Sequence, residues 1–156
     1  MIMKENEYSQ KAGKLFCEGY NCAQSVFCAF SDDLGINFET ALKLSSSFGG
    51  GMGRLREVCG AVSAMFMIAG LKYGYTSPDD DKIKAQHYAR IQQLAEEFKK
   101  NNKSIICREL IGLDIQQDSP IPAKRTEQYY KARPCEKLVK EAAYIISNYI
   151  NSTKHS

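Results

Sequence analysis

Apolar residues recur at helical spacing in several stretches of the chain, and this periodicity restricts the fold more than any other feature. In residues 134–150, one face of the predicted helix carries Leu138, Ala142, Ile145, Ile146 and Tyr149. This spacing is typical of an amphipathic helix that packs on a core. Further helices are predicted over residues 5–17, 22–30, 38–48, 55–73 and 78–100, and a short one is predicted after Ser104. Strand signals are weak throughout, so the sequence predicts an all-α fold.

The predicted helices begin and end at residues that suit those positions. Asn21 is expected to cap the second helix, because its side chain can accept from a free backbone N–H group of the first turn. Gly74 is expected to end the fourth helix. Ser77 is expected to cap the fifth, with Pro78 at its first helical position. The polar stretch 114–133 is predicted to be a long loop, a kind of segment that often carries function.

The bulk composition indicates one domain over residues 1–156, a bundle of about six to seven helices. Residues 58–73 are strongly apolar, but the stretch is shorter than the roughly 20 apolar residues of a membrane span. We therefore expect it to form the central buried helix. The net charge of +3 is too small to indicate nucleic-acid binding. The charged N-terminal residues do not form a secretory signal, so we expect a cytoplasmic protein without membrane insertion.

Six cysteines are the first sign of chemistry, and four of them fall in or near the first turn of a predicted helix. These four are Cys22, Cys59, Cys107 and Cys135. A helix start presents free N–H groups and partial positive charge, which favour the thiolate that acts as nucleophile or metal ligand. The alternative for every cysteine of the chain is burial as a small apolar side chain. We favour this alternative for the other two cysteines, Cys17 and Cys28. The chain contains no Cys-x-x-Cys motif, so spacing alone does not indicate a zinc ribbon or a thioredoxin-type site.

A glycine-rich turn precedes Cys59 and is expected to end the third helix. It contains Gly49, Gly50, Gly51 and Gly53, whose backbone could approach a cofactor or form an anion-binding nest. A plain turn between helices is the alternative. Arg54 and Arg56 either pair with Glu57 at the surface or bring positive charge to a thiolate, and the sequence does not decide between these roles.

The two histidines, His87 and His155, give little indication of chemistry. His87 lies in the middle of a predicted helix, where a surface or half-buried position is expected, and His155 lies in a polar tail. No Ser/His/Asp arrangement or pair of carboxylates is recognisable, so the cysteines remain the only candidates for a reactive site.

Five segments in order resemble the C_GCAxxG_C_C family, whose members are described as redox-active proteins. They are residues 21–26 (NCAQSV), 49–53 (GGGMG), 57–62 (EVCGAV), 107–112 (CRELIG) and Cys135. The resemblance runs from about residue 8 to about residue 148. It implies that the signature cysteines are Cys22, Cys59, Cys107 and Cys135. Ala64 stands where the family motif ends in glycine, which puts in doubt only a role of that position in backbone approach to a ligand.

A similar domain occurs in split-Soret cytochromes, which are dimeric and bind haem and an iron–sulfur centre. The resemblance thus implies an iron–sulfur cluster, a homodimer and a redox partner, either a protein or a small thiol or disulfide. Haem is not expected, because the Cys-x-x-Cys-His attachment motif is absent.

Three hypotheses of different classes follow. In the first, the four cysteines form a redox site, as iron–sulfur ligands or as reversible dithiols, with Cys59 the most activated thiol. The protein would then be a thiol or iron–sulfur oxidoreductase or an electron carrier. In the second, the four thiolates hold a structural zinc ion without catalysis. In the third, the chain is a helical interaction module whose cysteines are incidental.

Overall fold

The chain folds into helices, as its periodicity predicts. The computed structural model describes residues 4–154, so His155 lies outside the described residues. The helices are α1 (Glu7–Cys17), α2 (Cys22–Ala29), α3 (Phe38–Ser45), the 3-10 turn η1 (Ser46–Phe48), α4 (Gly49–Met52), α5 (Gly60–Tyr73), α6 (Asp81–Asn102), α7 (Cys107–Leu110), α8 (Glu127–Ala132) and α9 (Cys135–Thr153). Residues 4–154 contain no strand, only an isolated antiparallel bridge between Val58 and Ile106. The all-α prediction is therefore confirmed.

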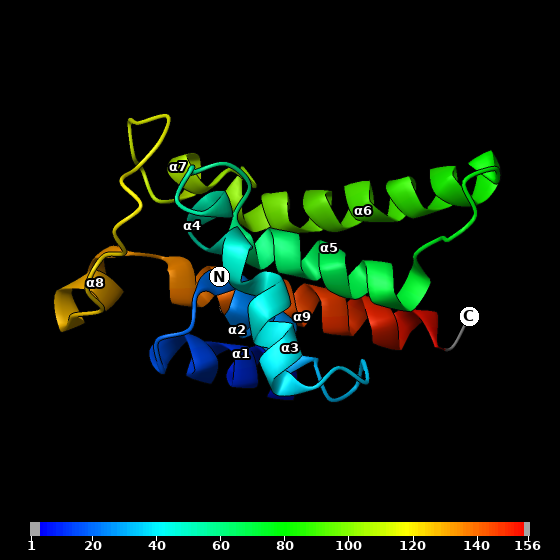
Figure 1. The fold of residues 1–156 in the computed structure, drawn as a ribbon, viewed down its shortest axis with the longest axis horizontal. Coiled ribbons are helices and arrows are strands. Elements are labelled where there is room, and N and C mark those ends of the chain that lie inside the picture. Colours follow the sequence, from blue (N-terminus) through cyan, green and yellow to red (C-terminus); the bar gives the residue numbers. More distant parts are fainter. Residues whose placement is uncertain (1–3, 155–156) are drawn as a thin grey trace.

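Helix α5 lies at the centre of the bundle, and the other long helices cover it (Figure 1). It packs against α2, α6 and α9, while α1 lies along α9 and α2. Its fully buried residues include Val62, Met65 and Ile68, and the buried apolar side chains of the bundle form one contiguous core. None of the helices in the described part of the chain combines the length and apolar character needed to cross a bilayer.

Side chains close the helix starts that the sequence marks. Asn21 accepts the backbone N–H of Gln24 at 2.9 Å, and the Gln24 side chain accepts the backbone N–H of Asn21 at 3.1 Å. This reciprocal pair satisfies two N–H groups that a helix start leaves free. Gly74 follows the last residue of α5, as predicted. The capping pair fixes the point at which α2 begins, and therefore the place of Cys22.

The fourth predicted helix begins later than expected, at Gly60 instead of Leu55. Gly53, Arg54 and Arg56 adopt positive φ angles of 61°, 66° and 60°, which a right-handed helix does not allow. The backbone of residues 57–59 instead pairs with residues 105–107. The Cys59 N–H donates to the Ile105 carbonyl at 2.8 Å. The expectation failed because this pairing uses the backbone groups that a longer helix would need.

Other boundaries also differ from the prediction: α1 begins at Glu7, and α3 ends at Ser45 and is followed by η1. Helix α6 begins at Asp81, because Asp80 and not Ser77 caps it, accepting the Ile83 N–H at 3.0 Å. The expected loop 114–133 contains the short helix α8, whose start is capped by Thr126. The remaining part of that stretch is irregular, as expected.

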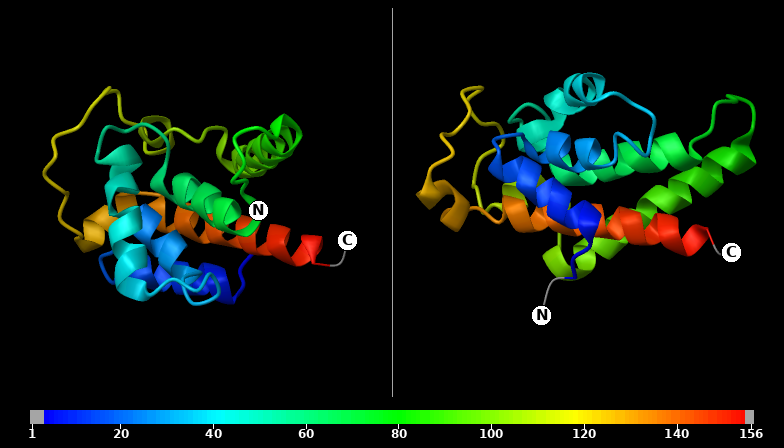
Figure 2. Two further views of the ribbon diagram at one scale, coloured as in Figure 1. Left: turned by 45° about the vertical axis from the view of Figure 1, so that its right-hand side comes forward. Right: turned by 90° about the horizontal axis from the view of Figure 1, so that it is seen from below.

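Short elements gather at one end of the bundle. Helices α4, α7 and α8 and the irregular segment 111–126 lie together there, away from the connection between α5 and α6 at the opposite end (Figures 1 and 2). The beginnings of α5 and α9 point to the same end (Figure 1). Residues far apart in sequence therefore meet there.

Candidate functional site

Four cysteines from four separate elements line one small cavity at this end. Its lining comprises Cys22, Cys59, Gly60, Ala61, Cys107, Leu110, Ile111, Cys135 and Leu138. The cavity is small: the centre of a water molecule can occupy a volume of about 10 Å³ in it. This leaves room for about one water molecule. The remaining lining is apolar, so the sulfur atoms are its only reactive groups. The structure thus brings together the four cysteines that the sequence singles out.

Each of these cysteines stands at the beginning of a helix, as predicted. Cys22, Cys107 and Cys135 are the first residues of α2, α7 and α9, and Cys59 directly precedes α5. Backbone N–H groups contact two of the sulfur atoms, those of Cys22 and Cys59. The Gly50 N–H donates to the Cys22 sulfur. The four helix starts thus converge on one cavity, which the sequence alone does not establish.

Two glycines allow the elements that carry the cysteines to approach closely. A Cβ atom on Gly60 would lie 2.7 Å from the Phe48 carbonyl oxygen and 3.2 Å from the Cys22 Cβ. A Cβ atom on Gly51 would lie 2.5 Å from the Cys107 Cβ. Real Cβ contacts are longer than these, so a side chain at either position would push two cysteine-bearing elements apart.

The predicted cofactor-binding glycines support the site from outside. Gly50, Gly51 and Gly53 have positive φ angles, which fold residues 49–53 into a tight turn beside the cysteines. Gly49 packs against the Asn21 side chain and Gly51 against Cys107. Within residues 4–154, the glycine among the lining residues is Gly60 and not one of these four. Their role in holding a cofactor stays a prediction.

Burial outweighs the helix starts at two of the four sulfur atoms. Burial raises the pKa of Cys59 far above its ordinary value, although the Ala61 and Val62 N–H groups lower it in part. Burial also raises the pKa of Cys107, against the Arg56 guanidinium. The expectation that Cys59 is the most activated thiol is therefore wrong, because desolvation disfavours its charged form more than the N–H groups favour it.

Cys22 and Cys135 form an interacting pair of thiols. The interaction raises the pKa of Cys22 and lowers that of Cys135. Cys22 is half-buried, and Cys135 keeps 8% of its surface exposed. Cys135 is thus the one cysteine of the four whose thiolate the surroundings favour.

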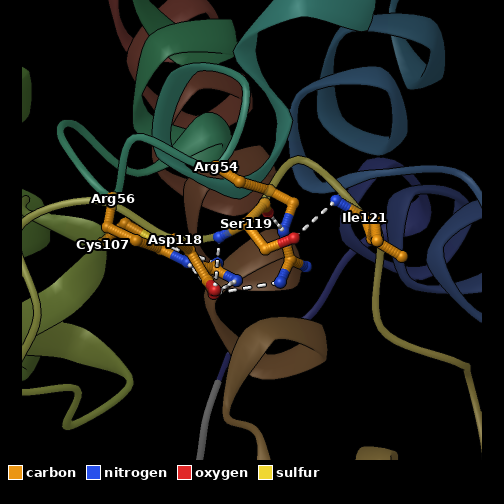
Figure 3. A network of polar contacts seen from close by, with 6 residues as sticks. All are labelled: Arg54, Arg56, Cys107, Asp118, Ser119 and Ile121. Carbon is orange, nitrogen blue, oxygen red and sulfur yellow. Dashed lines mark hydrogen bonds and ion pairs between the residues drawn. The ribbon is translucent and has the colours of Figure 1, made fainter.

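A buried arginine connects the site to the irregular segment 111–126. The Arg56 Nη1 donates to the Cys107 sulfur at 3.6 Å, while its Nε and Nη2 donate to one Asp118 carboxylate oxygen at 3.2 and 2.9 Å (Figure 3). Arg54 donates to the same oxygen at 3.0 Å. The hydrogen bonds from Arg56 lower the pKa of Asp118. The Glu57 carboxylate pairs with Arg108 at 3.4 Å and not with Arg56. Of the two roles that the sequence left open for Arg56, the structure therefore supports the one that brings positive charge to a cysteine sulfur.

Sequence reasoning missed Asp118. It lies in a stretch with no periodicity or motif, and only the fold brings it to Arg56. The signal in the sequence that points toward Asp118 is its place in the polar stretch 114–133, because long loops often carry functional residues.

The other two cysteines and the described histidine lie away from the cavity lining. Cys28 is fully buried in α2, as expected, whereas Cys17 is exposed at the end of α1 instead of packed. His87 is buried more deeply than expected, with its Nδ1 3.0 Å from Arg90 Nη1. Packing accounts for Cys28 and His87.

The cysteine side chains of the cavity are of a type that binds metals. Four cysteine sulfurs match in kind and number the ligands of an iron–sulfur cluster or a zinc ion. However, among residues 4–154 no three or more His, Cys, Asp or Glu side chains are arranged to hold a metal ion.

Comparison with known proteins supplies one match. A family model described as "Putative redox-active protein (C_GCAxxG_C_C)" matches residues 20–149, which include all four cysteines of the cavity. No curated protein and no solved structure matches the chain.

Proposed function

The chain belongs to the C_GCAxxG_C_C family of redox-active proteins, and on this premise we propose that Cys22 and Cys135 are a reversible dithiol. Cys59 and Cys107 complete the site beside them. The observation that carries the proposal is the small cavity that four cysteines line, in which Cys22 and Cys135 lie close enough for each to shift the pKa of the other. Two thiols that line one small cavity are placed to form a disulfide.

The reaction is a thiol–disulfide exchange. The Cys135 thiolate attacks one sulfur of a substrate disulfide, forms a mixed disulfide with it and releases the other half as a thiolate. Cys22 gives its proton to that thiolate and attacks the Cys135 sulfur. The Cys22–Cys135 disulfide forms, the second half of the substrate leaves as a thiolate that takes a proton from water, and two electrons have passed to the substrate.

The two roles follow from the surroundings of each sulfur. Cys135, whose pKa is lowered, is the attacking thiol of the proposal, and Cys22, whose pKa is raised, is the resolving thiol. The partner must reach the cavity edge at these two residues, since the cavity has room for about one water. A small disulfide or an extended disulfide-bearing segment of a partner protein meets this requirement. An external thiol reverses the steps and regenerates the dithiol.

An iron–sulfur centre is the second candidate. Its specific support is the set of N–H donors: Gly50 on Cys22, Ala61 and Val62 on Cys59, and Arg56 on Cys107. Such donors tune the potential of a cluster. Cys22, Cys59, Cys107 and Cys135 would hold the cluster, which supplies one-electron transfer when bound.

The first test is purification without oxygen, followed by a visible spectrum and assays of iron, sulfide and zinc per chain. Metal-free protein that gains and loses one disulfide in glutathione buffers supports the dithiol, and peptide mapping should locate it at Cys22 and Cys135. Cys22→Ser and Cys135→Ser should abolish it, while the control Cys17→Ser should not. Iron with equal sulfide supports the cluster instead.

Two further outcomes would overturn both redox forms. Zinc alone, with a melting temperature that falls on chelation, would identify a structural site. Thiols that stay unreactive in metal-free protein would leave the helical interaction module. Light scattering on the same sample tests the homodimer that the resemblance implies.

A further inference from the structure

We propose that Arg56 is a positioning residue of the redox site, that Asp118 orients it, and that the two together set the reduction potential of the cysteines. The inference rests on the proposed function and holds for either redox form. The observation behind it is a guanidinium shared between a cavity sulfur and a carboxylate from a distant segment (Figure 3).

The position of Arg56 is fixed from several sides. Only 4% of its surface is exposed, and its backbone adopts a φ of 60°, a conformation uncommon for arginine. Its carbonyl oxygen accepts the Arg108 backbone N–H at 3.3 Å and the Arg108 Nη1 at 3.0 Å. These constraints aim the guanidinium at the Cys107 sulfur. A residue that only filled space would not need a strained backbone and a charged head.

Asp118 holds the other side of the guanidinium, and its own segment is fastened in turn. The Asp118 N–H donates to the Arg54 carbonyl at 3.0 Å, and the Arg54 Nε donates to the Ser119 carbonyl at 2.6 Å. Residues 54–56 and 118–119 therefore clamp each other through backbone and side chains. The clamp keeps the carboxylate on Arg56, so that the Arg56 Nη1 stays directed at Cys107.

The charges of this network do not cancel. Two guanidinium groups, those of Arg54 and Arg56, share one carboxylate oxygen of Asp118. The Arg56 guanidinium, whose side chain is 5% exposed, holds its positive charge against the Cys107 sulfur, where solvent screens it weakly. Reduction adds negative charge to the sulfur atoms, as thiolate or as reduced cluster. The network therefore stabilises the reduced state and makes the site a stronger oxidant.

The test is an anaerobic redox titration of the full chain in glutathione buffers, read as the oxidised fraction after trapping free thiols. Arg56→Gln should shift the equilibrium about tenfold toward the oxidised form, equivalent to about 30 mV for a two-electron couple. Arg56→Lys keeps the charge and should recover part of the shift. Asp118→Asn keeps an acceptor but removes the compensating charge, so it should shift the equilibrium toward the reduced form.

Two variants serve as controls. Arg54→Gln removes an arginine that contacts Asp118 but not Cys107, and its shift should be smaller than that of Arg56→Gln. Lys72→Gln removes an exposed charge twelve residues beyond Gly60 in α5, about 18 Å along the helix, and should cause no shift.

Opposite shifts in Arg56→Gln and Asp118→Asn support the inference, because a purely structural role would move both variants in one direction. Shifts of the same sign, or no shift in either variant while the unaltered protein titrates, would overturn it and leave the proposed function standing. An unaltered protein that does not titrate overturns the proposed function itself. Should Arg56→Gln not fold, the signs of Arg56→Lys and Asp118→Asn decide.

Discussion

Replacing Gly51 by alanine should destabilise the protein through the contact between the glycine turn and Cys107. The new Cβ would lie 2.5 Å from the Cys107 Cβ and 2.9 Å from both the Arg56 Cα and the Glu57 backbone nitrogen. None of these atoms is the end of a flexible side chain. The turn or the beginning of α7 must therefore move, and Cys107 moves with it.

The magnitude has two parts. Gly51 has a φ of 69°, and placing an alanine in this left-handed region costs about 1–2 kcal/mol. Overpacking against a rigid neighbour costs about 1–3 kcal/mol more. The expected loss of unfolding free energy is thus about 2–5 kcal/mol. For a chain of this size, a loss in the middle of that range lowers the melting temperature by about 10 °C.

Two other glycines separate these parts. Gly112 has a φ of 72° and open space where a Cβ would stand, so Gly112→Ala carries the backbone cost alone. Gly70 lies inside α5, also with open space, and Gly70→Ala should stabilise the protein by about 0.5–1 kcal/mol. The difference between the Gly51 and Gly112 variants measures the contacts of the new Cβ with Cys107, Arg56 and Glu57 together.

Urea and thermal unfolding, followed by far-ultraviolet circular dichroism, give the three free energies. The redox response of the cysteines should be lost or altered in Gly51→Ala and kept in Gly112→Ala. Equal destabilisation in these two variants, within about 0.5 kcal/mol, would refute the reasoning, since it would show that the neighbours yield without cost.

Three further predictions follow from other parts of the molecule. Gly60→Ala should weaken the redox response of the cysteines and lower the stability of the protein, because the new Cβ would lie 3.2 Å from the Cys22 Cβ. A disulfide that still forms at the redox midpoint of the unaltered protein would contradict this. Burial raises the pKa of Cys28 to about 11, so mass spectrometry of native protein treated with iodoacetamide at about pH 8 should find this thiol unmodified, and rapid modification would show the core to be open. Burial, and then Arg90, lower the pKa of His87 below 6.5, so the unfolded chain binds more protons and stability falls as the pH drops below 6.5. Urea titrations of His87→Gln between about pH 5 and pH 7 should show a smaller fall than the unaltered protein, and an equal fall would exclude His87 as its source.

Much of the fold could be predicted because its signals are local. The capping pair of Asn21 and Gln24 lies within four residues, and the stripe of residues 138–149 states which face of α9 is buried. The same local signals placed four cysteines at helix starts. The convergence of these cysteines on one cavity depends on the packing between α2, α5 and α9. No short segment of the sequence encodes that packing.

The missed features all depend on partners distant in sequence. The segment before Gly60 reads as helix, and only its pairing with residues 105–107 and the left-handed Arg54 and Arg56 prevent one. Asp118 has no neighbour in sequence that marks it. The acidity of the thiols was misjudged for a related reason: a helix start is visible in sequence, whereas the depth at which Cys59 is buried is not.

The packing of α9 against α1, α2 and α5 has a consequence for biosynthesis. The ribosome makes Cys22, Cys59 and Cys107 before the segment that supplies Cys135. Until α9 is synthesised, the apolar surfaces it covers have no partner, and the cavity lacks one of its four cysteines. Completion of the four-cysteine cavity must therefore follow translation of residues 135–153, and chains that terminate within segment 111–126 should be substrates for chaperones and proteases.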